Sequence, residues 1–383
     1  MLIKNGMIFT MGEMNFEKGD ILIKDGKIVD VSENINVDDE YIIDANGATI
    51  IPGMIDAHCH LGLIEENMGQ EGSNVNEVSD PITPQIRAID GINPLDGGFK
   101  KAVKAGITTV VSGPGSANVI GGSFAAIKTH GICIDDMIVK SPVAMKVAFG
   151  ENPKRVYKGK NKAPMTRMAN AAMLRETIIE AKNYLNKKNI AKEKGEFFEE
   201  KLKYEALIPV LNREIPLKAH AHRADDILTA IRIAKEFDLR LTLDHVTEGH
   251  LITSHIKKSG YGAIVGPTLS FNSKIELTNR SFKTSVELIK AGVKTAIMTD
   301  HPVTNIERLP LCVALTMKEG LSFLEALRTV TIDAASIVGI DDKVGSIEKG
   351  KDADIVILDG SPFDIATKTL YTIINGEVVY KAE

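Results

Sequence analysis

Residues 51–60 read IPGMIDAHCH, an apolar run that ends in two histidines separated by one residue. Along a β-strand, residues two apart point to the same face, so His58 and His60 share a face and Cys59 points away. If this strand lines a barrel, both imidazoles point into its mouth. Two imidazoles on one rigid strand form half of a site for zinc, iron or manganese.

Three later apolar runs also end in a residue that can bind a metal, and a helical pattern separates each run from the one before it. These runs and their polar residues are 215–219 with His220, 241–244 with His245, and 296–299 with Asp300. Strands that alternate with helices are typical of parallel βα units, and a (β/α)8 barrel carries its active site at the carboxyl ends of its strands. We therefore expect these residues to bind one or two divalent transition metals together with His58 and His60.

A metal held in this way would lower the pKa of a bound water and polarise a carbonyl group. Neutral imidazoles hold such a cation and leave one position open for water. Zinc is the expected metal, with iron or manganese as alternatives. Asp300 would bind the metal and also take the proton of the water, which is the role of a general base.

A sixth ligand is expected near residues 141–153, which read SPVAMKVAFGENP. Glu151 follows the predicted strand on a turn that begins at Gly150, which would place its carboxylate at the barrel mouth. Lys146 lies within the strand and would sit deeper. We favour Glu151 as the ligand, with Lys146 as the alternative; otherwise Glu151 is a salt-bridged loop residue.

Three further polar residues are candidates for binding the substrate. His222 follows His220 by two residues and should face the same way, so it could bind substrate or a second metal, or support the site by a hydrogen bond. Arg223 could hold a carboxylate or phosphate of the substrate, because its guanidinium matches such groups. His301, beside Asp300, could orient the substrate or cap the following turn.

The two ends of the chain share a β-rich texture, and the middle alternates strand and helix. We expect an α/β protein: a (β/α)8 TIM-like barrel over residues 52–341, with a small β-sandwich domain built from residues 1–51 and 342–383. A charged, helix-rich segment at about 163–211 is too long for one crossover and reads as a helical insertion in the barrel, either a solvated hairpin or a lid or dimer arm.

The bulk properties of the 383 residues exclude several classes of protein. The net charge is −5, which favours neither nucleic acid nor an anionic membrane as a partner. There is no long apolar span, and the three cysteines show no CxxC spacing. We expect a cytoplasmic protein that acts on a small molecule, binds no nucleic acid or membrane, and forms a homo-oligomer.

With these residues identified, the chain resembles the amidohydrolase superfamily of metal-dependent hydrolases, and within it the imidazolonepropionase-like group. The motifs that carry the resemblance are PGMIDAHCH at 52–60, DHVTEG at 244–249, TDHP at 299–302, EALRTVTIDAA at 325–335 and VGSIEKGKDAD at 344–354. They run in order over nearly the whole chain. The resemblance implies a barrel with a terminal β-sandwich, metal binding by His58, His60, His220 and His245, and a double role for Asp300.

The resemblance also bears on the open questions. Many members of the superfamily bridge two metals with a carboxylated lysine or a glutamate, and Glu151 resembles the carboxylate ligand of N-acetylglucosamine-6-phosphate deacetylases. Deaminase-like members place a glutamate three residues after the histidine of the fifth strand, where this chain has Arg223. We therefore expect hydrolysis of an amide or cyclic amide C–N bond by a metal-activated water. The alternatives are a deaminase of a cyclic amidine or a non-catalytic binding relative.

Overall fold

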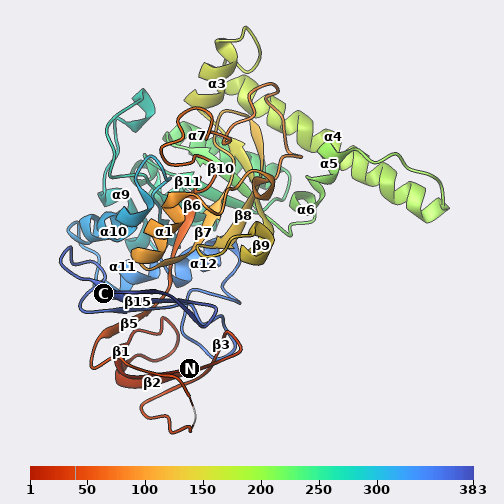
Figure 1. Ribbon diagram of the computed structural model, residues 1–383. Helices are drawn as coiled ribbons and strands as arrows, with labels where there is room; N and C mark the ends of the chain where they lie inside the picture. The colour runs from red at the N-terminus through yellow and green to blue at the C-terminus, as the bar shows by residue number, and fades with distance from the viewer. Residues whose placement is uncertain (39) are drawn as a thin grey trace.

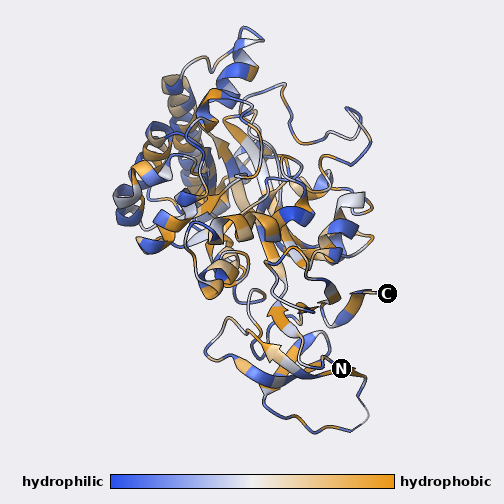
Figure 2. Ribbon diagram, turned by 90° about the vertical axis from the view of Figure 1, so that its left-hand side faces the viewer, coloured by the Kyte–Doolittle hydropathy of each residue, from blue (hydrophilic) through white to orange (hydrophobic). Residues whose placement is uncertain are grey.

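Eight strands form the wall of a barrel at the centre of the protein, whose computed structural model describes residues 1–38 and 40–383 (Figure 1). Neighbours in the wall follow the order of the chain: β6 (Met54–Cys59), β7 (Ile107–Ser112), β8 (Ile120–Lys128), β9 (Ile138–Ala148), β10 (Leu217–Ala221), β11 (Leu241–His245), β12 (Gly262–Val265) and β13 (Thr295–Ile297). Almost every residue of these strands is buried. Figure 2 shows the same strands as a largely hydrophobic centre surrounded by helices of mixed hydropathy.

One barrel strand departs from the expected (β/α)8 pattern. β8 runs antiparallel to both β7 and β9, while the other neighbouring pairs are parallel. The physical reason is the length of the connections: residues 113–119 and 129–137 are shorter than the dozen or so residues that a parallel crossover needs. The predicted TIM-like barrel is therefore confirmed as an architecture, with one strand reversed.

The barrel closes between its first and last strands at the residues expected to bind metal. The backbone N–H of Asp300 donates to the carbonyl of His58 at 3.2 Å, and the N–H of His60 donates to the carbonyl of His301 at 2.9 Å. This seam brings the ends of β6 and β13 side by side, although about 240 residues separate them in the chain.

Helices cover the outside of the barrel. They are α1 (Gly97–Lys104), α2 (Ile134–Met137), α3 (Glu151–Lys158), α4 (Arg167–Lys194), α5 (Leu202–Glu205), α6 (Ile208–Leu211), α7 (Ala224–Glu236), α8 (Thr253–Ser259), α9 (Lys283–Lys290), α10 (Leu309–Met317), α11 (Phe323–Arg328) and α12 (Ile332–Val338), with 3-10 turns η1 (Ala88–Asp90), η2 (Gly249–Leu251), η3 (Ile275–Leu277) and η4 (Ile306–Arg308). α7 is representative: Ile227, Ala230, Ile231 and Ala234 form its buried stripe, and the helix packs on β10 and β11.

Both ends of the chain build a separate domain below the barrel, as predicted, and the strands of this domain are connected in one hydrogen-bonded sheet (Figure 1). Its strands are β1 (Leu2–Ile8), β2 (Phe16–Lys24), β3 (Lys27–Ser32), β4 (Ile42–Asp44), β5 (Thr49–Pro52), β14 (Ile355–Leu358), β15 (Thr369–Ile374) and β16 (Glu377–Lys381). β5 pairs with β14, which joins the two ends of the chain. Only Gly53 separates β5 from β6, so the end sheet holds the first barrel strand at its amino end.

The helical insertion forms an arm that projects from the barrel (Figure 1). α4 spans 28 residues and ends at Gly195, whose φ of 66° lies in the left-handed region that glycine adopts easily. The helix-rich segment expected at about 163–211 therefore consists of one long helix followed by the short α5 and α6. Among the described residues, no helix is both long and apolar enough to cross a membrane.

Candidate metal and substrate site

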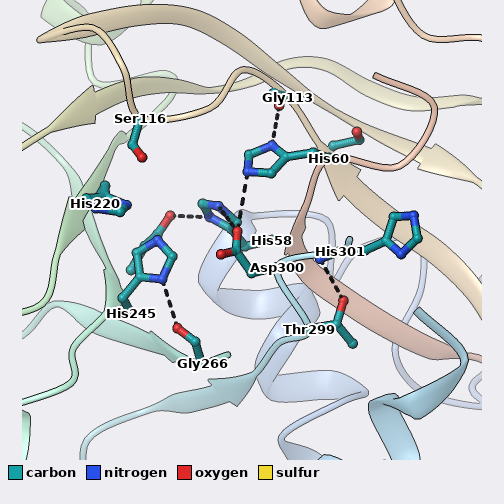
Figure 3. A network of polar contacts seen from close by, with 12 residues as sticks. His58, His60, Gly113, Ser116, His220, His245, Gly266, Thr299, Asp300 and His301 are labelled. Carbon is teal, nitrogen blue, oxygen red and sulfur yellow. Dashed lines mark hydrogen bonds and ion pairs between the residues drawn. The ribbon is translucent and has the colours of Figure 1, made fainter. Parts of the chain in front are cut away.

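Two groups of side chains that could hold a metal ion meet at the carboxyl ends of the barrel strands. One consists of His58, His60 and Asp300, and the other of His220, His222 and His245; within each group the ligand atoms lie within 4.8 Å of one another, and all six residues are buried. Figure 3 shows His58, His60, His220 and His245 around Asp300. The structure thus brings together five of the six predicted ligands and adds His222.

Hydrogen bonds on one ring nitrogen orient these imidazoles. Nδ1 of His60 lies 2.7 Å from the carbonyl of Gly113, and Nδ1 of His245 lies 2.8 Å from the carbonyl of Gly266. Because a carbonyl can only accept, each Nδ1 must carry the proton, which leaves the lone pair of a neutral ring on Nε2. Burial lowers the pKa of His222 to about 3, which keeps that ring neutral as well.

Several side-chain nitrogen and oxygen atoms in the site have no hydrogen-bond partner among the described residues. They include Nε2 of His222, Nε2 of His245 and Oδ1 of Asp300, all buried. Buried polar atoms are nearly always paired, so a cluster of unpaired ones calls for a ligand that is absent from the protein itself. Neutral imidazoles with a carboxylate are the donor set that a divalent transition metal prefers. These residues therefore fit the predicted metal.

Asp244 supports the first group from below, a role that the sequence-based interpretation did not assign. Its Oδ2 lies 2.6 Å from Nδ1 of His58 and 3.2 Å from Nζ of Lys218, and its Oδ1 accepts a hydrogen bond from Thr242. His58, Lys218 and Asp244 are all fully buried. Carboxylates that accept from the far nitrogen of a metal-binding histidine fix its orientation and make it a better ligand.

We expect Asp244→Asn to weaken metal binding roughly 10- to 100-fold, the usual cost of losing such a partner. The variant keeps the size of the side chain but removes the charge that faces His58 and Lys218. Metal titration of the chelated protein, with circular dichroism to verify folding, measures the effect. Asp238→Asn is the matched control, because Asp238 is exposed and pairs with Arg213. An unchanged metal affinity in a folded Asp244→Asn protein would refute this role.

Lys146, and not Glu151, lies beside the histidines. Lys146 is fully buried in β9, and its Nζ is 3.3 Å from Nε2 of His58. Burial lowers the pKa of this amine to about 8. The carboxylate of Glu151 belongs to neither metal-binding group and does not line the cavity above them.

A local turn explains why Glu151 does not reach the site. Gly150, with a φ of 79°, turns the chain so that Glu151 becomes the first residue of α3. Its backbone N–H donates to Oε2 of Glu276 at 3.1 Å. The following residue faces the site instead: Nδ2 of Asn152 lies 3.4 Å from Nε2 of His220.

A cavity of about 280 Å³ opens above the two groups. Its floor includes His60, His220, His222, His245 and Asp300, and its mouth carries Ser116, Asn152, Arg155 and Lys274. Such a volume lies just below the usual range for small-molecule sites, which indicates a small substrate.

Two predicted substrate-binding residues lie elsewhere. Arg223 forms two hydrogen bonds with the carboxylate of Asp225, at 3.0 and 3.1 Å, and does not line the cavity. Nδ1 of His301 accepts a hydrogen bond from the backbone N–H of Ile306 at 3.1 Å, and its ring points away from the site in Figure 3. His301 thus caps the following turn, which was the alternative for this residue.

Comparisons with known proteins agree with this geometry. The model of the amidohydrolase family matches residues 49–379. The crystal structure of an amidohydrolase from Thermotoga maritima MSB8 shares 42% sequence identity with this chain, with a TM-score of 0.97 over 100% of both chains.

Two curated relatives are more distant in sequence. Amidohydrolase tasK of Hapsidospora irregularis is 29% identical over 94% of this chain, which spans only 39% of the length of that relative. Imidazolonepropionase of Treponema denticola is 26% identical over 95% of this chain and 86% of its own length.

Proposed function

Because the chain belongs to the amidohydrolase family, whose members are hydrolases acting on C–N bonds, we propose that it hydrolyses an amide or cyclic amide bond in a small molecule. The observation that carries this proposal is the set of buried atoms at the base of one cavity, Nε2 of His222, Nε2 of His245 and Oδ1 of Asp300, that have no hydrogen-bond partner among the described residues. One or two divalent metal ions would complete the site, and we propose zinc, since nitrogen and carboxylate ligands suit it.

The residues divide into two metal-binding sets. His58, His60 and Asp300 would hold one ion, and His220 and His245 would hold a second, with His222 close by. When bound, the metal supplies a more acidic water and polarises the carbonyl of the scissile bond.

We propose that Lys146, and not Glu151, links the two sets after its amine has been carboxylated. The neutral amine adds to carbon dioxide, an N–C bond forms, and the proton leaves the nitrogen for solvent. The product is a carboxylate on a side chain whose Nζ lies 3.3 Å from Nε2 of His58. Lys146 lines the cavity, so its nitrogen is within reach of a small molecule such as carbon dioxide.

Asp300 would move the proton during hydrolysis. Its Oδ1 lies 3.4 Å from Nε2 of His58 and 3.3 Å from Nε2 of His60, a position that points this oxygen at the ion-binding set. The carboxylate takes a proton as water attacks the amide carbon, and returns it to the nitrogen as the C–N bond breaks. A positioned carboxylate is suited to both steps, since it can act as base and then as acid.

The test of this function begins with metal content. Elemental analysis of protein purified without chelator is expected to show one or two transition-metal ions per chain, with zinc foremost. Chelation should abolish hydrolysis of a panel of N-acyl amino acids, dipeptides and cyclic amides, and adding metal back should restore it. A protein that carries no metal and takes up none on reconstitution would overturn the proposal.

A further inference from the structure

We propose that Lys274, Arg155 and Asn152 form an anion-binding subsite at the mouth of the cavity, and that the substrate is a small amide bearing a carboxylate. This inference rests on the proposed function, because it assigns the substrate class of that same site. Lys274 and Arg155 were not among the residues expected from the sequence to bind substrate.

The charges that line the cavity favour an anion. Two cations line it outside the metal-binding sets, Arg155 and Lys274. Asp300 belongs to the metal-binding set at the floor, and Glu276 pairs with Lys274, so among the described residues the charge of Arg155 is left without an acidic partner. Charge interactions are stronger in a partly enclosed cavity than in open water. A substrate with a negative group near the mouth is therefore the one that these walls complement.

A buried carboxylate holds Lys274 in place. Glu276 is 3% exposed; its Oε1 lies 2.8 Å from Nζ of Lys274, and its Oε2 accepts the backbone N–H of Glu151. The same Oε1 lies 3.7 Å from Nε2 of His222. Glu276 thus ties Lys274 to the start of α3 and to the histidines below.

Among the described residues, the ammonium of Lys274 has two partners for its three donors, which leaves one donor for a ligand. It has three N–H donors; it forms an ion pair with Glu276 and donates to Oδ1 of Asn152 at 3.3 Å. Asn152 in turn donates from Nδ2 to the hydroxyl of Ser116 at 2.7 Å. Because both partners are fixed, little side-chain entropy is lost when a ligand oxygen takes the third position.

Arg155 supplies the second cation. It follows Asn152 by three residues on α3, so both side chains lie on one side of that helix and face the cavity. Within the described part of the chain, Arg155 has no acidic partner within 4.0 Å, in contrast to Arg223, which is bound to Asp225. A free guanidinium fork matches the two oxygens of a carboxylate.

The rest of the wall defines the neutral part of the substrate. Apolar side chains line it on several sides: Ile64, Val75, Pro267, Leu277 and Val303. A carboxylate at Arg155 and Lys274 would leave the scissile bond above Asp300 and the histidines, with an apolar group against this wall. N-acyl derivatives of apolar amino acids and carboxylate-bearing cyclic amides have this arrangement.

The experiment compares matched pairs of compounds on metal-loaded protein. The pairs are N-acetyl-L-leucine with N-acetyl-L-leucinamide, and 5-oxo-L-proline with its amide, so that only the carboxylate differs. We expect calorimetry to show the carboxylate of a pair binding at least 10-fold more tightly. Lys274→Met and Arg155→Met should each weaken that binding roughly 10- to 100-fold, as expected for a hydrogen bond to a charged group. Arg223→Met is the matched control and should leave the binding of both members of each pair unchanged.

The outcomes separate this subsite from the function. Equal binding of both members of each pair would overturn the subsite, whether or not the compounds are hydrolysed. Carboxylate binding that is equally tight in wild type and in both variants would overturn it as well. Turnover of neutral amides without such a preference would leave the hydrolase intact and refute the subsite alone. Carboxylate binding that depends on Lys274 and Arg155, without hydrolysis of any amide by metal-loaded protein, would support the subsite and count against the proposed reaction.

Discussion

Asp300→Asn is expected to lower kcat by roughly 10²–10⁴-fold while the protein still binds its substrate. Asparagine occupies the same volume but is neutral, so it cannot take the proton of the attacking water or return it to the leaving nitrogen. Oδ1 of Asp300 also lies 3.3 Å from Nε2 of His60. Loss of its charge would therefore weaken metal binding by this set and lower kcat further. Single-turnover kinetics and equilibrium binding on the same preparation separate these effects.

The control for this variant is Asp90→Asn, an exposed carboxylate that pairs with Arg87 and does not line the cavity. It should retain full activity. Metal analysis must accompany both variants, so that a rate lost with the metal is distinguished from a rate lost with the base. An Asp300→Asn enzyme with normal metal content and normal kcat would refute the role of Asp300.

Lys146→Met is expected to remove about one metal ion per chain and most of the activity, whereas Glu151→Gln should leave the metal content unchanged. The first variant removes the only group that we propose to link the two sets. The second alters a side chain at the start of α3 that does not line the cavity. Elemental analysis of both proteins, after equal dialysis and reconstitution, measures the difference.

The two variants serve as controls for each other, because Lys146→Met tests Lys146 as the linking group and Glu151→Gln tests Glu151 in the same role. Methionine fills much of the buried volume of Lys146, so that folding can be retained without the amine. A protein that loses metal with Glu151→Gln and keeps it with Lys146→Met would restore the expectation drawn from the sequence. Mass spectrometry of intact wild-type protein under gentle conditions would additionally show the mass of the added carboxyl group.

The convergence of the candidate metal ligands could be predicted because their positions follow from strand geometry. His58 and His60 are two residues apart at the end of an apolar run, and His220, His245 and Asp300 each close another run. Parallel strands of a barrel end on one face, so residues at successive strand ends must converge. That reasoning requires no knowledge of side-chain rotamers or of loops.

The reversed strand β8 illustrates a limit of the same reasoning. β8 was not predicted, and its direction depends on the connection that joins it to β7. Residues 113–119 are too few for a helix to cross back over the sheet. The length of this Gly-rich segment was the signal that could have indicated an antiparallel neighbour.

The charged residues that contact His58 and support the site were harder to predict from the sequence. Lys218 and Asp244 lie inside otherwise apolar strands, and their spacing from His220 and His245 could have marked them as buried polar residues. Their pairing with His58, however, joins three different strands and cannot be derived from local sequence. Buried charges need partners, so a lysine in the middle of a barrel strand should be read together with every acid at the same level.

The residues at the mouth depended on loop and helix-end conformation. Arg223 and Arg155 both follow barrel strands, and the sequence offers no means to choose between them. The side chain of Arg223 donates a hydrogen bond to Asp225, two residues later in the chain. Arg155 lines the cavity from the second turn of α3. Lys274 and Glu276 come from the segment around η3, which has no repeating pattern from which their direction could be derived.

The most direct test of the account is product analysis by mass spectrometry on chelated and metal-reconstituted protein, with amides, cyclic amides and aminated heterocycles offered in parallel. Hydrolysis of a C–N bond at Asp300 predicts an acid and an amine, or a ring-opened product, from the amides only after metal is restored, and neither from Asp300→Asn. Release of ammonia from aminated purines, pyrimidines or pterins, with no product from any amide, would contradict it.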